Sequence, residues 1–209
     1  MEDVLQVYAR PYNAKRPVVC LDEARKELRA TPNGSQPIKS GQPARQDYEY
    51  ERNGTASFFL WVEPLAGRRH VQVTERQTGH EFAEILRHLV EEAYSDTETI
   101  VLVTDNLATH KKDCLYARFP PEQAFAIAQK IEWHYTPEHG SWLNIAECEL
   151  SALHRQCLDR RISDAKTLNT EVAAWQRERN QARVTIDWQF TTEDARIKLK
   201  RLYPVLKEQ

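Results

Sequence analysis

The stretch Thr99-Ile-Val-Leu-Val-Thr-Asp105 decides the fold class. Its apolar residues run almost without a break and end in an acid. A continuous apolar run, rather than an alternating one, is typical of a strand buried on both faces, as in a sheet covered by helices. The run therefore predicts a central strand of an α/β domain, with Asp105 at its carboxyl end.

Other segments extend this sheet on both sides. A second apolar run, Pro17-Val-Val-Cys-Leu-Asp22, also reads as a buried strand that ends in an acid. Residues 55–62 and 70–74 are rich in β-branched and aromatic side chains, and the turn residues between them predict a hairpin. Residues 131–135 predict one more short strand.

Helices are predicted between and after these strands. Residues 80–94 carry a one-sided apolar stripe at helical spacing. Further helices are expected over residues 121–130, 142–158, 163–179 and 191–202. Ser163 is expected to cap the third of these, and Thr191 or Thr192 the last. Three strands followed by alternating strands and helices predict a mixed sheet flanked by helices.

The length and composition favour a single soluble domain. The chain has 209 residues, 41% of them hydrophobic and 29% charged, which is the balance of a globular protein. Within it, residues 1–16 are expected to be a linker and residues from about 180 to 209 a helical tail. Residues 31–47 are polar and rich in proline and glycine, which predicts a loop.

The composition and charge of the sequence also limit the cellular location and the partners that it supports. No apolar run approaches the roughly 18 residues of a membrane span, and the acidic N-terminus does not resemble a signal peptide. Four cysteines without a C-x-x-C pair suggest reduced thiols and a cytoplasmic location. The net charge of −2 is unevenly divided, because residues 151–209 carry 12 basic and 8 acidic residues and thus +4. A basic C-terminal part is compatible with binding DNA phosphates.

The candidate chemistry lies in three acids. Asp22 and Asp105 end neighbouring strands, and ligands of open α/β sheets bind at the carboxyl ends of strands. Glu147 lies one turn into the helix after residues 131–135, so its carboxylate can return to the same crevice. Three clustered carboxylates suit Mg²⁺ or Mn²⁺, and without a cation they should raise at least one pKa. Glu149 is a rival for the third position, although it should face another side of the helix.

The residues around these acids carry a resemblance to a known family. The three motifs occur in order and with sensible spacing. They are Val-Val-Cys-Leu-Asp22-Glu23, Val-Leu-Val-Thr-Asp105-Asn106-Leu-Ala-Thr-His110 and His134-Tyr-Thr-Pro-Glu-His-Gly-Ser-Trp-Leu-Asn144-Ile-Ala-Glu147. Together with Arg45-Gln-Asp-Tyr-Glu-Tyr-Glu-Arg-Asn-Gly-Thr-Ala56, they resemble the DDE transposases of bacterial insertion sequences related to the Tc/mariner superfamily.

The resemblance implies an RNase H-like fold and two metal ions held by Asp22, Asp105 and Glu147. It also implies cleavage of DNA at transposon ends and joining of the freed 3′-hydroxyl to target DNA, by an assembly of at least two chains. The chain departs from the family pattern in one respect. Family members usually carry N-terminal helix-turn-helix modules, whereas here the first strand begins near residue 17. A separately encoded DNA-binding half is therefore an expected partner.

Six further side chains beside the motifs are candidates for contacting DNA or supporting the acids. They are Asn106, His110, His139, Ser141, Trp142 and Asn144. Among them His110 is favoured, because it follows a strand end at the crevice. Ser141 is expected to cap the helix that carries Glu147. Trp142 either packs in the core or stacks on an unpaired base.

Other readings of the sequence remain open. A zinc site could use His110, His134 and His139 with Cys114 or Cys148, but these lack the tight ligand pairs of zinc sites. A serine hydrolase is disfavoured because the G-x-S-x-G elbow is absent around Ser141. Two alternatives lie closer to the main hypothesis. One is an RNase H-like nuclease that does not transpose, and the other is an inactive remnant that only binds DNA or dimerises.

Overall fold

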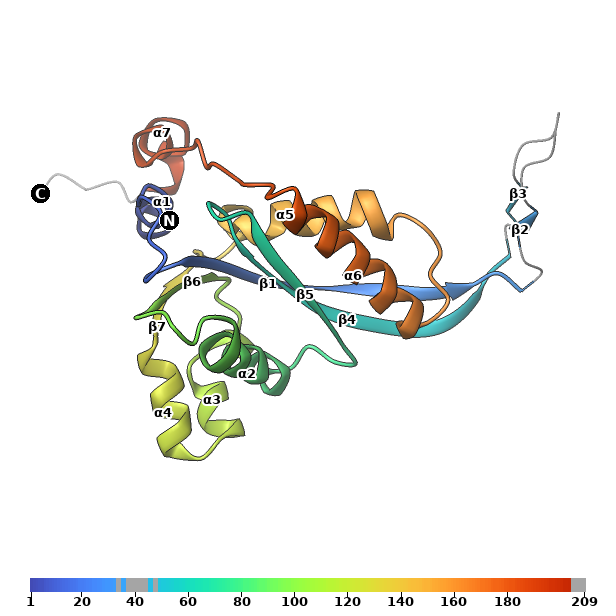
Figure 1. The fold of residues 1–209 in the computed structure, drawn as a ribbon. Helices are drawn as coiled ribbons and strands as arrows, with labels where there is room; N and C mark the ends of the chain where they lie inside the picture. The colour runs from blue at the N-terminus through green and yellow to red at the C-terminus, as the bar shows by residue number, and fades with distance from the viewer. Residues whose placement is uncertain (33–34, 37–44, 47–48, 204–209) are drawn as a thin grey trace, which may run out of the picture.

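A five-stranded mixed sheet forms the centre of the computed structural model, which describes residues 1–32, 35–36, 45–46 and 49–203. In the order β5-β4-β1-β6-β7, the first three strands are antiparallel and the last three parallel. The strands are β1 (Val18–Ala30), β4 (Glu51–Glu63), β5 (Arg68–Thr74), β6 (Ile100–Thr104) and β7 (Ile131–Tyr135). The predicted mixed sheet is thus confirmed (Figure 1).

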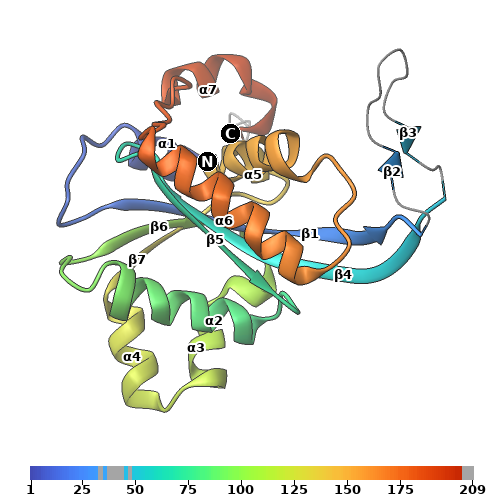
Figure 2. The same ribbon diagram turned by 45° about the vertical axis from the view of Figure 1, so that its right-hand side comes forward.

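Helices cover both faces of this sheet (Figures 1 and 2). One face is covered by α5 (Ile145–Leu153) and α6 (Ala165–Gln181). The other is covered by α2 (Gly79–His88), α3 (Asp113–Arg118) and α4 (Pro121–Gln129). Near the chain ends, α1 (Glu2–Tyr8) packs against α7 (Thr192–Lys198). Shorter turns are the 3₁₀ segments 108–110, 141–143 and 200–202 and the π-helical segments 89–93 and 154–158.

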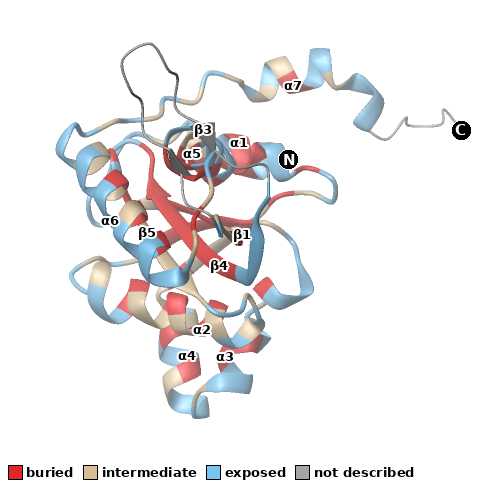
Figure 3. Ribbon diagram, turned by 90° about the vertical axis from the view of Figure 1, so that its right-hand side faces the viewer, coloured by how far each residue is buried: buried red, intermediate tan, exposed pale blue. Residues whose placement is uncertain are grey.

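The alternation of side chains along the strands divides the core in two. Cys20 and Leu60 point towards α5 and α6, whereas Leu21 and Phe59 point towards α2, because successive strand residues face opposite sides. All five residues of β6 are buried, as its continuous apolar run predicts. Figure 3 shows the buried strands between two partly exposed layers of helices.

The strands β1 and β4 reach beyond the body of the sheet. They pair antiparallel from Cys20 with Val62 to Ala30 with Glu51, and the resulting ribbon projects away from the helices (Figure 1). Beyond it lie two short paired strands, β2 (Ser35–Gln36) and β3 (Arg45–Gln46). The loop predicted over residues 31–47 therefore contains this short pairing, and the rest of it lies outside the described residues.

Several predicted boundaries need correction. Strand β1 does not end at Asp22 but continues to Ala30, because β4 supplies a partner along the whole ribbon. Residues 1–16 differ from the expected linker, since they include helix α1 with Val4, Leu5 and Val7 buried in the core. The six-residue α3 had no predicted counterpart.

The helix ends also differ in detail. The cap of α6 is Asp164, whose carboxylate accepts a hydrogen bond from the Thr167 amide at 2.8 Å, and not Ser163. Thr191 caps α7 in a reciprocal capping box with Asp194, as expected. The C-terminal tail is helical only in part, because residues 184–190 form neither helix nor strand. Within the described ranges, no helix combines the length and apolarity needed to cross a membrane.

The central strand gives a direct test of this packing. Leu102 lies in the middle of β6 and is fully buried. Leu102→Ala should lower the free energy of unfolding by about 2–5 kcal/mol, through lost burial and a cavity. Urea denaturation measures this change. The matched control is Ile197→Ala on α7, where the side chain is 78% exposed, and a loss there as large as at Leu102 would contradict the assigned core.

Candidate active site

Asp22 stands where the parallel pairing of β1 ends. The last pair between β1 and β6 is Cys20 with Val103, so the chain is free of β6 from there onward. Asp22 faces the α5 side of the sheet, in step with Cys20, and is largely buried. Asp105 follows directly after the last residue of β6. The two aspartates therefore flank the point where β1 and β6 part.

Glu147 approaches the same point from a helix. It lies in the first turn of α5, which packs over β1 and β4. Its carboxylate interacts electrostatically with Asp22 and with Asp105. The structure thus brings Asp22, Asp105 and Glu147 together from two strands and a helix.

The raised pKa of Asp22 shows that bringing these negative charges close together is unfavourable. Burial, together with the charges of Glu147, Glu23 and Asp105, raises the pKa of Asp22 to about 7. A hydrogen bond from the Glu23 amide to Asp22 Oδ1 at 2.9 Å opposes the rise only in part. Asp22 consequently takes up a proton near neutral pH unless a cation enters the site.

Glu147 responds in the same direction. Partial burial and the charges of Asp105 and Glu23 raise the pKa of its carboxyl group. Among the residues that the structure describes, no arginine, lysine or histidine forms an ion pair with Asp22 or Glu147. Both carboxylates therefore lack a compensating positive charge from the protein.

Asp105 differs, because His110 neutralises it. The buried His110 ring holds Asp105 Oδ1 through Nδ1 and Glu23 Oε2 through Nε2, the latter at 3.0 Å. Burial alone would lower the pKa of His110, but the hydrogen bonds and charges of Asp105 and Glu23 outweigh it and raise the pKa to about 9. The ring also stacks on Phe82, with 4.3 Å between centroids. His110 is therefore a charged imidazolium that orients Asp105.

Asn144 connects the helix of Glu147 to the strand of Asp22. It is fully buried, and its Nδ2 donates to Leu21 O at 2.9 Å and to Asp22 Oδ2 at 3.2 Å. Its Oδ1 accepts from the Ala146 amide at 3.1 Å, which makes Asn144 the N-cap of α5. The expectation that Ser141 caps this helix is wrong, because Ser141 is exposed and begins a separate 3₁₀ turn.

The other candidates lie further from the acids or on the surface. Asn106 is exposed, and its Oδ1 accepts a hydrogen bond from Lys111 Nζ. His139 is 94% exposed in its side chain and adopts a positive φ of 58° in the turn before α5. Trp142 is 44% exposed and meets Phe190 edge-on at 5.8 Å. It is therefore a surface aromatic rather than a core residue.

The zinc reading finds no support in this geometry. His134 points to Asp3 at 2.7 Å and to Glu132 at 2.9 Å, whereas His110 is engaged by Asp105 and Glu23. Across residues 1–32, 35–36, 45–46 and 49–203, no three histidine, cysteine, aspartate or glutamate side chains form a preformed cage for a metal ion. The three acids are near one another but are not closed around one point.

Their chemistry nevertheless fits a hard divalent cation. All three offer carboxylate oxygens, the ligands that Mg²⁺ and Mn²⁺ prefer. Burial and mutual repulsion penalise the charge on Asp22 and Glu147, and a bound cation would relieve that repulsion. Because metal ligands must be deprotonated, binding would also release the proton held by Asp22.

The sequence assigns no role to Glu23, yet in the structure its carboxylate holds the second nitrogen of His110. The signal was the adjacent pair of acids, because neighbours on a strand face opposite sides. Glu149 was a rival for the third acid, but it is buried in ion pairs with Arg69 and Arg179.

Comparison with known proteins places this site in a family. The model of the DDE superfamily endonucleases matches residues 17–169, which contain all three acids. The chain belongs to the DDE superfamily of endonucleases. Family membership implies dependence on a divalent metal ion for this DDE domain. A comparison with curated protein sequences finds no significant match.

Solved structures agree on the fold of the DDE domain. The Mos1 strand transfer complex superimposes with a TM-score of 0.52 at 13% identity, over 87% of this chain and 54% of that one. The Mos1 transposase paired-end complex with the left transposon end gives 0.53 at 14% identity, over 87% and 55%. The chain thus spans about half the length of each neighbour, and the fold is RNase H-like, as the resemblance implies.

The raised pKa of Asp22 has a measurable consequence for stability. The folded chain keeps this proton up to about pH 7, whereas the unfolded chain loses it near pH 4. The folded state therefore binds more protons between these values, and the Asp22 contribution lowers stability as pH rises from about 4 to 7. Between pH 5 and pH 8 in EDTA, Asp22→Asn should gain roughly 2–3 kcal/mol of unfolding free energy relative to the parent.

Chemical denaturation at both pH values gives this difference. Asp96→Asn is the matched control, because Asp96 is exposed and outside the site. If Asp22→Asn differed from the parent by the same amount at pH 5 and pH 8, the assigned environment of Asp22 would be wrong.

Two substitutions of Asn144 separate the stability gained from its capping of α5 from the stability gained from the hydrogen bonds that it donates. Asn144→Ala removes both and should cost about 1–3 kcal/mol of unfolding free energy. Asn144→Asp keeps a capping oxygen for α5 but cannot donate to Leu21 or Asp22, so it should recover only part of the loss. Full recovery in Asn144→Asp, measured by urea denaturation, would show that the donor bonds contribute nothing.

Proposed function

We propose that this chain is the catalytic domain of a DNA transposase that uses Asp22, Asp105 and Glu147 to cleave and join DNA strands. The observation that carries the proposal is the convergence of these three acids from β1, the end of β6 and the start of α5 in a member of the DDE endonuclease family. The Mos1 neighbours are a strand transfer complex and a paired-end complex with a transposon end. They support DNA as the substrate and a paired assembly of chains.

In the proposed site, Asp22, Asp105 and Glu147 would hold two Mg²⁺ or Mn²⁺ ions. Such ions activate the attacking oxygen and stabilise the leaving oxygen of an in-line displacement. The protein supplies the placement of the ligands. Asn144 fixes Asp22 against the start of α5, and His110 fixes the direction of Asp105.

The proposed reaction has two steps of the same kind. In the first, water attacks a phosphodiester at the transposon end, so one P–O bond forms and another breaks, leaving a 3′-hydroxyl. In the second, that 3′-hydroxyl attacks a phosphodiester of the target, which joins the strands and frees a target 3′-hydroxyl. One set of carboxylates serves both steps, because each is a phosphoryl transfer to an oxygen nucleophile.

The proposed partners and setting follow from the same reading. The chain acts as a homodimer or larger assembly on DNA, and recognition of the transposon end comes from a separate DNA-binding part. A cytoplasmic setting at the nucleoid agrees with four free cysteines, three of them buried.

The test uses the full chain together with its separate DNA-binding part, Mn²⁺ and a supercoiled plasmid that carries the element's own flanking sequences. We expect metal-dependent nicked and joined products from the parent and a loss of at least about 10³-fold in Asp105→Ala, by removal of a metal ligand. Glu138→Ala is the control, since Glu138 is an exposed acid of the turn before α5 and should act like the parent.

Each product pattern decides between functions. Nicked products without joined ones would indicate a nuclease that does not transpose. No Mn²⁺ binding that depends on Glu147, measured by calorimetry, would indicate an inactive remnant. Full activity of Asp105→Ala would overturn the proposed mechanism.

A further inference from the structure

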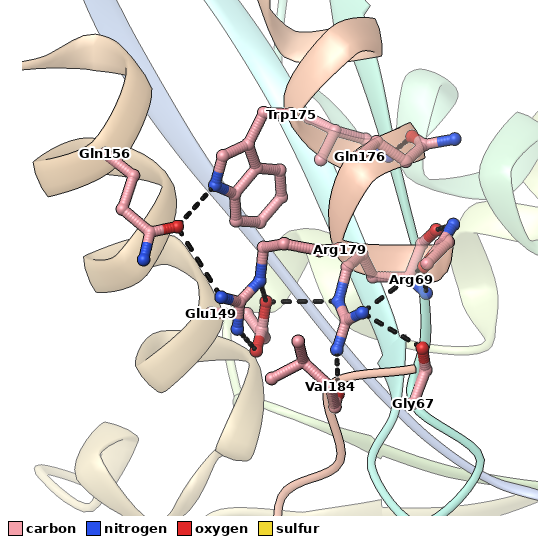
Figure 4. A network of polar contacts seen from close by, with 10 residues as sticks. Gly67, Arg69, Glu149, Gln156, Trp175, Gln176, Arg179 and Val184 are labelled. Atoms are coloured by element: carbon pink, nitrogen blue, oxygen red, sulfur yellow. Dashed lines mark hydrogen bonds and ion pairs between the residues drawn. The ribbon is translucent and has the colours of Figure 1, made fainter. Parts of the chain in front are cut away.

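Behind the catalytic helix lies a buried ion-pair network (Figure 4). The Glu149 carboxylate, 2% exposed, accepts hydrogen bonds from Arg179 Nε at 3.2 Å and Arg179 Nη2 at 2.7 Å and forms an ion pair with Arg69 Nε at 3.2 Å. The Arg69 side chain is fully buried, and that of Arg179 is 16% exposed. One acid of α5 is thereby held between a strand and a second helix, because Arg69 lies on β5 and Arg179 on α6.

The two arginines are themselves held from several directions. Arg69 Nη1 donates to Gly67 O at 2.9 Å and Nη2 to Val184 O. Arg179 Nη1 reaches Gln156 Oε1 at 3.5 Å, on the π-helical turn that continues α5. Backbone carbonyls thus hold the Arg69 guanidinium group and the Gln156 side chain holds that of Arg179, so neither is positioned by Glu149 alone.

The main-chain contacts make this frame continuous. Asn180 on α6 accepts from the Arg69 amide at 2.9 Å and donates to Arg69 O at 2.8 Å, so α6 is fastened to β5. Trp175 Nε1 donates to the same Gln156 oxygen at 2.8 Å. Side-chain hydrogen bonds therefore join β5, α6 and the turn after α5 around Glu149.

Stability alone does not account for such a network. Placing an acid and two guanidinium groups out of water is costly, and apolar residues of similar volume often give equal or greater stability. What apolar packing lacks is direction, because an ion pair with hydrogen-bonded geometry fixes one orientation of its partners. The network is therefore better explained by a requirement on the position of α5.

That position determines where Glu147 stands. Glu147 and Glu149 are two residues apart on a helix and so face different sides, roughly 200° around its axis. Asn144 holds the N-terminal end of α5, and Glu149 holds the opposite side one turn later. A helix held at both points can neither rotate nor slide, and a misplacement of about 1 Å in a catalytic group can cost 10²-fold in rate.

We propose that Glu149, Arg69 and Arg179 form a positioning device that sets the place of Glu147 relative to Asp22 and Asp105. This inference rests on the proposed function for its consequence at the metal site. Glu149 is then a positioning residue that acts through the helix and touches neither metal nor DNA.

Two variants separate positioning from folding. Glu149→Gln keeps the shape of the side chain and removes its charge. The triple variant Glu149→Leu, Arg69→Met, Arg179→Met replaces the network by apolar packing, which should keep the chain folded while removing the directional contacts. The matched control is Leu86→Ala, a fully buried position in α2 on the other face of the sheet, which lowers stability without touching α5.

The first readout is Mn²⁺ binding to the full chain without DNA, followed by calorimetry and by the electron paramagnetic resonance spectrum of Mn²⁺. We expect affinity about 10- to 100-fold weaker in both network variants, as for other residues that orient metal ligands. Leu86→Ala should bind like the parent. Parental affinity and spectrum in the folded triple variant would overturn the inference.

The second readout needs no metal. Cys148 is an exposed, free cysteine next to Glu147, and Tyr116→Cys supplies a second exposed position on α3 across the sheet. Spin labels at these two sites report the position of α5 as a distance distribution. We expect a shift or broadening in the network variants only, and a distribution identical to the parent's would contradict the proposal.

The two readouts distinguish a failure of the positioning inference from a failure of the proposed function. If the parent bound no Mn²⁺, or if Asp22→Asn bound it equally well, the proposed function would fail. The spin-label distances would then still decide whether the network positions α5.

Discussion

The unequal pairing of β1 is the constraint on which the rest of the structure depends. Along one edge β1 is paired with β4 from Cys20 to Ala30, but along the other it pairs with β6 only from Val18 to Cys20. The strand that is released from β6 at this point opens a gap, and Asp22 and Asp105 border it. Helix α5 crosses β1 and β4 at the same place and brings Glu147 to the gap. The acidic site is thus a product of sheet topology.

The electrostatics of the site follow from that placement. Folding gathers Asp22, Glu23, Asp105 and Glu147 and supplies one imidazolium, His110, to oppose them. Burial and the neighbouring negative charges raise the pKa of Asp22 and that of Glu147, so the charged form of these two groups is disfavoured in the folded chain. A site held in this condition is prepared for a cation, whose arrival removes the repulsion that folding created.

The sequence predicted the parts of the fold that patterns of burial define. The continuous apolar run before Asp105 identified β6, and the stripe of residues 80–94 identified α2. Patterns of apolar residues did not predict the elements that lie outside the core. Beyond Asp22 the strand carries charged residues on a partly exposed ribbon, so its continuous apolar run stops although the strand continues. Helix α3 is too short, with only Cys114 and Leu115 buried, to show a stripe.

The site residues divide in the same way. Asp22, Asp105 and Glu147 were proposed from their motifs, and the structure places them together. The sequence could not predict the partners of Glu23 and Glu149. His110, Arg69 and Arg179 are distant from them in the sequence, and only the folded chain brings them into contact. The spacing of residues along the helix predicts that Glu149 faces away from Glu147. It does not predict that two arginines lie on that side of the helix.

The two halves of the core, one on each face of the sheet, are in contact with each other at this site. Asp22 points to the α5 side of the sheet, while the next residue, Glu23, points to the α2 side and holds His110, which rests on Phe82 of α2. The layer of α2, α3 and α4 therefore contributes to the site, because Phe82 supports the His110 ring and that ring holds Asp105.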